Sequence, residues 1–539
     1  MQEEQKNVPV VAMYDIRGIQ KYIFRTEKVK DAIGASAIVE NIIEEALDYA
    51  VQKKIKEDSI TAELEWQDEK EYLPFSLSEK DVQVLFIGGG NAFVMYRNRA
   101  LCVEINQIMA FYILEKTYSL QLAVAIVEKT DHYSYDYKNL HQEMNRIKAD
   151  MPVSGVLGTL PIMQMEIKTG YPVVSKEAGS TESVLKKKVG EKKQKEIADK
   201  NLKIFDNLAS KKGVDSTLAV VHIDGNNMGL RIREYIAEEA DYEKAVEKMR
   251  RISYQISHSY CEVFEQMSRL FNQKSGSLQE YENKELPFCF IRKILTAGDD
   301  ITYVCNAKIA MASVEYFCRE IAKRTMTGDT DQESVEKYGF SVCAGIAYIG
   351  SHFPFYTGYQ VAEACCESAK DFAKCHKDGE RIGNFVDYQI CKNAESLNLD
   401  KVRVDEYCTW SGEVLLGRPY YISAEQGKNA SDYQVEEIHQ FDFLKAAILH
   451  FQNPNKIPRS FAKALRNVYP LGENEMKLFQ SFLQSRHWEM PDQSEEEYCL
   501  SSDGTKTAKW YDALELLDYY IDLDAFLKQV NSLDEGGAL

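Results

Sequence analysis

The chain has 539 residues, of which 45% are hydrophobic, and its formal net charge is −19 at pH 7. This length accommodates roughly two to four domains with cores of their own, and the negative charge argues against a general nucleic-acid coat while leaving room for a local basic groove. The 12 cysteines include no C-x-x-C pair, which argues against a disulfide framework and against zinc. A polar N-terminus and the lack of an apolar run of roughly 20 residues predict a cytoplasmic protein with neither signal peptide nor membrane anchor.

The first predicted unit begins with an apolar strand and continues with a glycine-rich hairpin. Residues 8–18, "VPVVAMYDIRG", form a strand that ends near Asp15, and residues 82–96, "VQVLFIGGGNAFVMY", form two strands joined by a glycine turn. The pattern then predicts an amphipathic helix over 97–116 and a further strand over 120–128.

A second stretch repeats this order. The segment "STLAVVHIDGNNMG" ends its strand at Asp224, and "ILTAGDDITYVC" forms a hairpin that is again followed by a helix and a strand. Asp15 precedes Gly90 by 75 positions, and Asp224 precedes Asp299 by the same 75. Equal spacing of two motifs indicates a duplicated unit, although compensating insertions could mimic it.

The order of strand, helical region, hairpin, helix and strand predicts an α+β fold. It is the split β-α-β layout, in which an antiparallel sheet is covered on one face by helices. A stripe of apolar residues at helical spacing between Asp224 and the second hairpin is interpreted as core packing rather than as a site. Its members are Val246, Met249, Ile252, Ile256, Tyr260, Val263, Met267 and Leu270.

The two units and their surroundings divide the chain into four predicted parts. These are a first unit over 1–130, a linker or helical insertion over 131–214, a second unit over 215–395 and a helical C-terminal domain over 396–539. Within the insertion, the lysine-rich stretch 174–195 is low in apolar residues. It predicts a solvated, flexible linker, with a phosphate-binding arm as the weaker alternative.

The acids of the second unit are its candidate catalytic and metal-binding residues. Asp224 closes one strand and Asp299 and Asp300 lie at the neighbouring hairpin, so the sheet brings acids from distant parts of the sequence to one edge. Such acids on rigid strands suit a two-magnesium site for phosphoryl or nucleotidyl transfer. The backbone of the turn after Asp224 is expected to hold a triphosphate at a helix N-terminus. The alternative is an ordinary β-turn beside a helix cap.

The hairpin of the first unit has no acid at the places of Asp299 and Asp300. It carries Gly88, Gly89, Gly90 and Asn91 instead, so a two-ion site cannot be completed there. We therefore expect the first unit to be a non-catalytic partner whose glycines allow a nucleotide to approach the backbone closely. The alternative is that these glycines only make a tight hairpin.

Together these motifs resemble a known family. The segments "YDIRGIQKYIF", "GGGN", "HIDGNNMG", "AGDD" and "CAGIAYIGSHFPFYTGYQVAEACCESAK" are similar to the large polymerase-like subunit of type III CRISPR effector complexes, over most of residues 8–390. The resemblance implies two ferredoxin-like palm domains related to nucleotidyl cyclases with a GGDEF motif. It also implies that the second palm condenses ATP into cyclic oligoadenylate messengers in antiviral defence, with Mg²⁺ or Mn²⁺ as cofactor.

The family's functional residues fall on particular positions of this sequence. Its Gly-Gly-Asp-Asp hairpin falls on residues 297–300, its strand-end metal aspartate on Asp224, and its phosphate-contacting lysine on Lys370. The expected nucleotide-binding residues are Gly225, Asn226, Asn227, Met228, Gly229, Gly298, Lys370, Gly88, Gly89 and Gly90. Expected partners are nucleoside triphosphates, with guide or target RNA and other effector subunits as further candidates.

The sequence also departs from the family pattern. Ala297 replaces the first hairpin glycine, which is tolerable where that position does not need a positive φ, and Asn226 stands where many relatives carry a second aspartate. No cysteine-based zinc element and no histidine–aspartate nuclease motif is found, so DNA cleavage by this chain is not expected. These departures keep a second hypothesis open, namely a catalytically impaired nucleotide-binding or scaffold subunit of an RNA-guided complex. A dimeric cyclase that makes cyclic dinucleotides is a third, less favoured reading, because the second unit is already internal.

Overall fold

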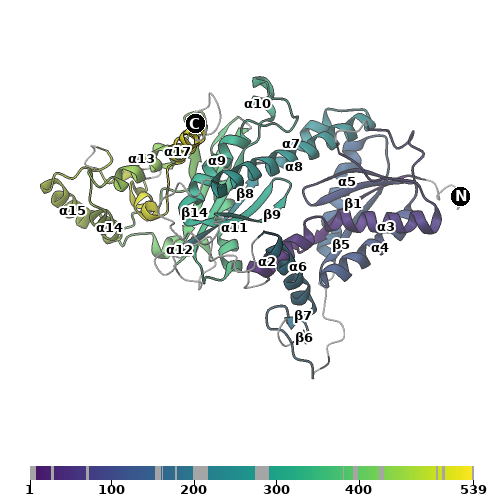
Figure 1. The fold of residues 1–539 in the computed structure, drawn as a ribbon. Coiled ribbons are helices and arrows are strands. Elements are labelled where there is room, and N and C mark those ends of the chain that lie inside the picture. Colours follow the sequence, from purple (N-terminus) through teal and green to yellow (C-terminus); the bar gives the residue numbers. More distant parts are fainter. Residues whose placement is uncertain are drawn as a thin grey trace.

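A computed structural model provides the fold, and most of the chain is described. The described residues are 8–25, 29–67, 72–151, 160, 162–175, 179–197, 217–273, 290–379, 381–392, 398–423, 430–492, 496–500 and 504–536. Two sheets, each with its own helices, lie beside one another, and a group of helices follows at the C-terminal side (Figure 1). This confirms the predicted α+β class.

The first sheet has five strands in the spatial order β2-β3-β4-β1-β5. They are β1 (Val10–Arg17), β2 (Ala62–Glu63), β3 (Val82–Gly88), β4 (Asn91–Tyr96) and β5 (Gln121–Glu128). The central strand β1 runs antiparallel to both β4 and β5. Its helices are α1 (Ile19–Phe24), α2 (Val29–Val39), α3 (Ile42–Asp58), α4 (Arg99–Thr117) and α5 (Tyr133–Asp150).

The second sheet has six strands in the order β15-β14-β11-β8-β10-β9. They are β8 (Thr217–Gly225), β9 (Ile291–Ala297), β10 (Asp300–Asn306), β11 (Val342–Gly350), β14 (Asn384–Ile390) and β15 (Tyr420–Ile422). Its helices are α7 (Met228–Ala237), α8 (Tyr242–Gln273), α9 (Ala310–Ile321), α10 (Gln332–Tyr338) and α11 (Phe355–Cys375). In both sheets the first strand, β1 or β8, lies between the hairpin and the strand that follows the next helices, β5 or β11, as the split β-α-β layout predicts.

Helices cover both faces of each sheet, so the expectation of one covered face is wrong. In the first sheet, Val10 and Ala12 pack with residues of α3 and α4, whereas Val11 and Met13 pack with residues of α5 and α8. In the second sheet, residues 218–223 of β8 are all buried. Continuous apolar strands of this kind are buried on both sides. The additional cover comes from the helix that follows β5 or β11, which is α5 in the first unit and α11 in the second.

The two units exchange helices across their boundary. Helix α8 of the second unit packs on β3 of the first, where Arg250 Nη1 donates to Val84 O (3.1 Å) and Leu85 O (3.3 Å). In the reverse direction, α2 of the first unit packs on β9, where Ser36 Oγ donates to Ile294 O. Each hairpin edge is therefore bound by a helix of the other unit, which fixes how the two sheets face each other.

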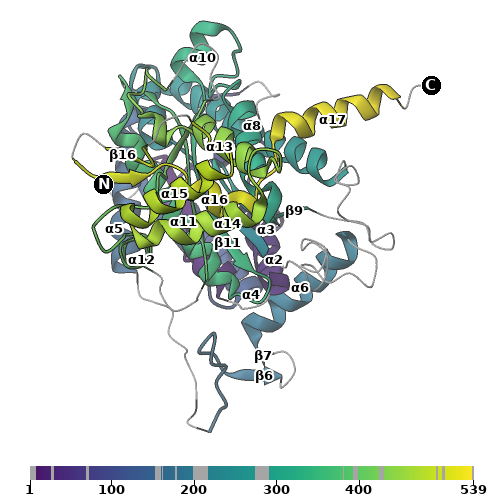
Figure 2. The ribbon, with the colours of Figure 1, turned by 90° about the vertical axis from the view of Figure 1, so that its left-hand side faces the viewer.

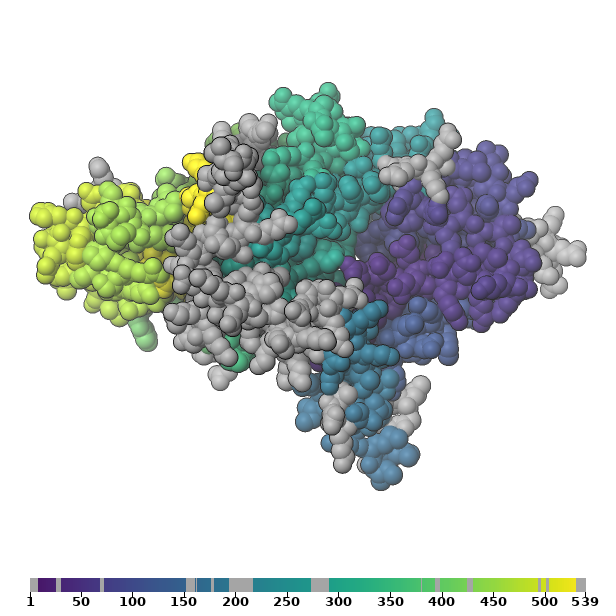
Figure 3. Space-filling view, in the orientation of Figure 1, coloured from purple at the N-terminus to yellow at the C-terminus, as the bar shows by residue number. Residues whose placement is uncertain are grey.

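An apolar core continues through this boundary. Phe24 of α1 stacks on Tyr359 of α11 with ring centroids 3.7 Å apart, and both rings are fully buried. One buried cluster contains residues of β1, α3 and α4 together with Val220 of β8 and Ala362 of α11. Figure 3 shows the purple first unit directly against the teal second unit. Because they share buried surface, the two units form a single packed body.

The lysine-rich stretch is not the flexible linker that its composition predicted. A short pair of strands, β6 (Val173–Ser175) and β7 (Gly179–Ser180), leads into α6 (Thr181–Ile197), which packs along α2. Lys186 of α6 is buried, pairs with the buried Glu182 and donates to Tyr22 O (2.6 Å). A Cβ added at Gly34 would lie 2.0 Å from Lys186 O, so a glycine lets the two backbones approach. Residues 198–214 of the predicted insertion lie outside the described part of the chain.

The last part of the described chain is mostly helical, as predicted, and Figure 2 looks onto it from the end of the molecule. Its main elements are α12 (Leu399–Glu406), α13 (Phe441–Gln452), α14 (Arg459–Val468), α15 (Glu473–Ser485), β16 (Tyr498–Leu500), β17 (Lys506–Ala508), α16 (Tyr511–Glu515) and α17 (Leu523–Gly536). The fully buried Arg418 bonds to Tyr388 O of β14 and to Glu515 of α16, and so ties these helices to the second sheet. None of the described helices has the length and apolarity needed to cross a membrane.

Candidate active site

The sheet brings the predicted acids together. In the antiparallel register of β8 and β10, Ile223 is opposite Ile301, so the next step outward brings Asp224 opposite Asp300. Asp299 lies in the tight turn before Asp300, where Gly298 adopts a φ of +67°. Ala297 ends β9 without a positive φ, so the alanine that replaces the family's glycine is compatible with the hairpin.

Asp299 and Asp300 approach Asp224 from different sides. A Cβ added at Gly225 would lie 2.6 Å from Asp299 Oδ2, so the missing side chain of this glycine gives the Asp299 carboxylate its place. Asp300 lies instead near His222, whose Nδ1 is 3.3 Å from Asp300 Oδ1 and 3.0 Å from Thr302 Oγ1. Because successive strand residues point to opposite faces, Asp224 and His222 share a face of β8.

Burial and the crowding of negative charge raise the pKa values of the two hairpin acids. Burial and then the charge of Asp224 raise the pKa of Asp299 to about 7. Burial, Asp224 and Glu363 raise the pKa of Asp300 to about 7. Burial lowers the pKa of His222, so its imidazole is neutral and does not offset the acids. Without a cation, therefore, the site resists full ionisation at neutral pH.

Lys370 of α11 partly balances this charge. Its Nζ donates to Asp224 Oδ2 in an ion pair. Burial disfavours the charged lysine, but Asp224 outweighs burial and the pKa of Lys370 is raised. Lys370, the predicted phosphate-binding residue, is therefore paired with Asp224, the predicted metal ligand. A phosphate bound next to Asp224 would be within reach of the lysine.

The donor set fits a hard divalent cation. Carboxylate oxygens are the ligands that Mg²⁺ prefers, and Mg²⁺ is commonly held by one or two carboxylates together with substrate phosphates. Among the residues that the structure describes, no group of three or more His, Cys, Asp or Glu side chains is arranged to hold a metal ion by itself. Within the described part of the chain, Asp300 Oδ1 and Tyr260 Oη are buried at the site and find no hydrogen-bond partner. Asp224 and Asp299 would thus hold the ion jointly with a nucleotide.

The turn after β8 is only partly available to a ligand. Asn226 donates from Nδ2 to Ser341 Oγ (3.2 Å) and Gly383 O (3.0 Å), and from its backbone N to Ser341 O (3.0 Å). Its side-chain amide thus ties the segment before β11 to the loop before β14, and the residue also lines the cavity beside the N-terminus of α7. The Met228 side chain is buried in the core. What remains is the N-terminus of α7, where Asn227 has a φ of +51° and the N–H groups of residues 227–229 precede the first intrahelical bonds.

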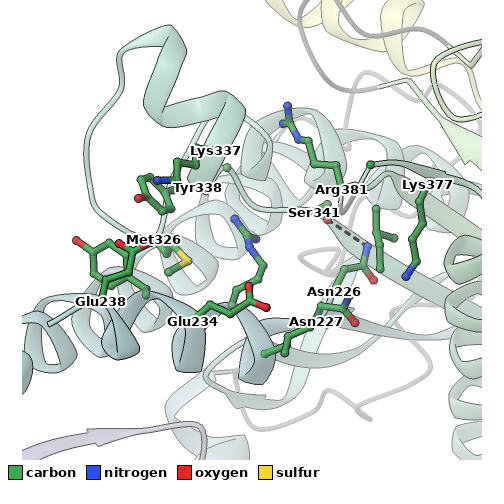
Figure 4. Close-up of a pocket in the computed structure, with 16 residues that line it drawn as sticks. Asn226, Asn227, Glu234, Glu238, Met326, Lys337, Tyr338, Ser341, Lys377 and Arg381 are labelled. Carbon is green, nitrogen blue, oxygen red and sulfur yellow. Dashed lines mark hydrogen bonds between the residues drawn. The ribbon is translucent and has the colours of Figure 1, made fainter. Parts of the chain in front are cut away.

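A cavity of about 550 Å³ opens beside this helix N-terminus (Figure 4). Its walls come from α7, from α10 and the start of β11, and from a small hairpin made of β12 (Lys377–Asp378) and β13 (Arg381–Ile382). Figure 4 shows Asn226 and Asn227 on one side and Tyr338 on the other. The charged lining residues are Arg231, Glu234, Glu238, Lys337, Lys377 and Arg381. Cations outnumber acids, so the cavity suits a phosphate-bearing ligand.

The first unit retains half of this arrangement. Asp15 near the end of β1 pairs with Lys148 of α5, which repeats the pairing of Asp224 with Lys370. The hairpin of the first unit, however, carries Gly88, Gly89 and Gly90, and the φ angles of Gly89 and Gly90 are +59° and +76°. The first unit therefore has the strand-end acid and its lysine without the hairpin acids.

The two hairpin turns touch. A Cβ added at Gly298 would lie 3.0 Å from Gly89 Cα and 3.1 Å from Gly89 N. A Cβ added at Gly88 would lie 3.1 Å from Ser253 Oγ of α8. The glycine turn of the first unit thus lies against the turn that carries Asp299, and it borders the acidic site.

Three neighbours of the acids were not predicted. His222 and Asp224 are two positions apart on one strand, so strand alternation alone could have placed His222 at the site. Glu363 lies one turn after Tyr359 on α11 and accepts from its hydroxyl (3.4 Å). Tyr260 belongs to the apolar stripe of α8 and was interpreted as core, and no sequence signal distinguishes its hydroxyl from those of other buried tyrosines.

Replacing Asp299 by Asn should stabilise the cation-free protein at high pH. The folded protein raises the pKa of Asp299 from 3.8 to about 7, so between these values it binds more protons than the unfolded chain, and its free energy of unfolding falls as the pH rises. We expect the free energy of unfolding of Asp299→Asn to be about 1–2 kcal/mol higher than that of the wild type at pH 8, after allowance for solvent screening. Near pH 4 the two free energies should be equal. Thermal unfolding with a chelator at both pH values measures this, and a less stable variant at pH 8 would contradict it.

Comparison with known proteins finds similar solved structures. No family model matches the chain, and no curated protein sequence matches it. Among solved structures, Csm1 in T. onnurineus is 14% identical, with 95% of this chain and 69% of that chain covered and a TM-score of 0.45. A Csm1-Csm4 cassette in complex with pppApA is 12% identical, covering 96% and 70%, with a TM-score of 0.49. One in complex with cA4 is 14% identical, covering 97% and 70%, with a TM-score of 0.41. In its solved-structure matches, the chain thus resembles Csm1, which one of these structures contains as a Csm1-Csm4 subcomplex in the type III-A CRISPR-Csm interference complex.

Proposed function

We propose that this chain is a nucleotidyltransferase that condenses ATP into cyclic oligoadenylate. The two units act as paired palm domains, of which the second is catalytic, and the chain works as the large subunit of an RNA-guided antiviral complex. The observation that carries the proposal is the convergence of Asp224 and Asp299 beside Gly225, at the place where the two hairpin turns touch. The choice of ATP and of a cyclic product rests on the resemblance of the sequence motifs.

The reaction requires two nucleotides that face each other. The 3′-hydroxyl oxygen of one forms a bond to the α-phosphorus of the other, the bond between the α- and β-phosphates breaks, pyrophosphate leaves and the hydroxyl proton passes to solvent. Bound Mg²⁺ or Mn²⁺ would supply Lewis acidity at the α-phosphate and lower the pKa of the attacking hydroxyl. Paired palms suit this geometry, because the second unit holds the reacting triphosphate and the glycine turn of the first unit borders the neighbouring nucleotide.

The side chains then have separate roles. Asp224 and Asp299 would hold the cation, and Asp300, which is opposite Asp224 in the strand pairing and lies beside His222, would add negative charge. Lys370, which is paired with Asp224 in the cation-free protein, would neutralise phosphate oxygens of the bound nucleotide. The N-terminus of α7 and the cationic lining of the cavity bind the remaining phosphates, since helix N-termini attract anions.

The experiment supplies the chain with α-labelled ATP and Mg²⁺ or Mn²⁺, alone and assembled with effector subunits, guide and target RNA. Products are identified by mass spectrometry, and pyrophosphate is measured in parallel. We expect cyclic oligoadenylate and stoichiometric pyrophosphate in the RNA-activated assembly. Binding of ATP without release of pyrophosphate in either arm would reject the enzyme and support the scaffold hypothesis.

A further inference from the structure

The hydroxyl of Tyr260 lies among the acids of the site. Tyr260 is on α8, its side chain is fully buried, and its Oη finds no hydrogen-bond partner among the residues whose structure is described. A Cβ added at Gly225 would lie 3.0 Å from Tyr260 Oη and 2.6 Å from Asp299 Oδ2. The space that Gly225 leaves open is therefore occupied from two sides, by the hydroxyl and by the carboxylate.

Packing explains the ring of Tyr260 but not its hydroxyl. The ring makes an edge contact with Phe340 at 5.4 Å and a tilted contact with Phe317 at 5.9 Å, and phenylalanine would make the same contacts. A buried hydroxyl without a partner costs free energy, so a purely structural position favours phenylalanine. Ring packing alone therefore does not account for the hydroxyl of Tyr260.

Other buried tyrosines show what is particular to Tyr260. Tyr348 on β11 of the same sheet is also fully buried, and its hydroxyl also has no partner. The hydroxyl of Tyr348 interacts electrostatically with Cys305, Tyr519 and Arg418, none of which is a carboxylate. The charges acting on Tyr260 are first Asp299 and then Asp224. An unpartnered hydroxyl is thus not rare in this protein, but this one faces the proposed cation ligands.

We propose that Tyr260 is a positioning residue for the cation site, whose hydroxyl donates to Asp299 and holds that carboxylate toward Asp224 when a divalent cation is bound. This inference rests on the proposed function, because it assigns the ligands their roles. When a residue that hydrogen-bonds to a metal ligand and orients it is replaced, the affinity for the metal commonly falls 10- to 100-fold.

The position of Tyr260 also relates the site to the first unit. Ser253 and Tyr260 are seven residues apart on α8, so they lie on one side of the helix, two turns apart. Ser253 touches Gly88 of the first hairpin, and Tyr260 touches Gly225 beside Asp299. One rigid helix therefore contacts the glycine turn of the first unit and the acids of the second.

The test measures Mn²⁺ binding to the whole chain by electron paramagnetic resonance, with nucleotide affinity in the absence of metal as a second readout. The variants are Tyr260→Phe, the matched control Tyr348→Phe, and Asp299→Asn. We expect Tyr260→Phe to raise the Kd for Mn²⁺ about tenfold without changing nucleotide affinity. The Kd of Tyr348→Phe for Mn²⁺ should stay within about twofold of the wild-type value. Asp299→Asn should abolish Mn²⁺ binding.

The outcomes separate the two proposals. If Asp299→Asn loses Mn²⁺ and Tyr260→Phe binds it as Tyr348→Phe does, the role of Tyr260 is rejected and the proposed function stands. If Asp299→Asn binds Mn²⁺ like the wild type, both proposals are rejected. Gly225→Ala is a second variant, because its methyl group would crowd both Tyr260 and Asp299. It should weaken Mn²⁺ binding at least as much as Tyr260→Phe, and unchanged binding in both overturns the inference.

Discussion

Asp299→Asn should lower the rate of ATP condensation by about 10³-fold or more, because a cation that stabilises the transition state contributes several kcal/mol and each 1.36 kcal/mol is tenfold in rate. Asparagine fills the same volume but cannot supply the second anionic oxygen beside Gly225. Asp224→Asn should act similarly, since Asp224 is the acid that both hairpin acids face. Initial rates of pyrophosphate release at saturating ATP and Mn²⁺ measure the effect.

Asp15→Asn is the matched control for this experiment. Asp15 occupies the same place in the first unit and is paired with Lys148 as Asp224 is with Lys370, but no hairpin acid lies beside it. We expect the rate to fall less than about tenfold, which corresponds to less than 1.4 kcal/mol. Equal losses for Asp15→Asn and Asp299→Asn, with unchanged circular dichroism, would show that the second unit is not the catalytic one.

Phe24→Ala should lower the free energy of unfolding by about 3–5 kcal/mol, the usual cost of removing a fully buried aromatic ring. The ring lies between the units, stacked on Tyr359 at 3.7 Å and close to Phe355 at 5.8 Å. Its loss leaves a cavity in the core that both units share, so activity should also fall as the hairpin turns lose their alignment. Denaturant unfolding monitored by fluorescence measures the loss of stability, and the rate of pyrophosphate release without denaturant measures the loss of activity.

Tyr49→Ala provides the comparison for Phe24→Ala. Tyr49 also pairs with an aromatic ring, that of Tyr112 at 5.0 Å, but its side chain is 50% exposed on α3. Its removal should cost less than about 1 kcal/mol and leave activity unchanged. If Phe24→Ala is no more destabilising than Tyr49→Ala, the units are not held together through this core.

The elements of the site were predictable because they depend on local pattern. Alternation and apolar runs predicted β8 and the β9–β10 hairpin, and the repeated spacing predicted that Asp224 and Asp299 occupy equivalent places to Asp15 and Gly90. Adjacent antiparallel strands then had to bring these acids to one edge. The helix stripe that includes Tyr260 was likewise correct as a statement about burial.

The remaining features depend on contacts between segments far apart in the sequence. The composition of 174–195 predicted a solvated linker, but α6 packs on α2 through a close glycine crossing and one buried pair, Glu182 with Lys186. Asn226 was expected at the nucleotide, and nothing in the sequence indicated that its amide also donates to Ser341, just before β11, and to Gly383, just before β14. The cover on the second face of each sheet and the hydroxyl of Tyr260 also follow only from the tertiary arrangement.

The central claim is that Asp224 and Asp299 share a divalent cation, and a crystal structure with Mn²⁺ and a non-hydrolysable ATP analogue tests it most directly. The account predicts an anomalous peak about 2.1 Å from an oxygen of each carboxylate, with Lys370 moved from Asp224 to a phosphate. A peak that contacts only one of the two acids, or a nucleotide bound with Lys370 still paired to Asp224 and no cation there, would contradict it.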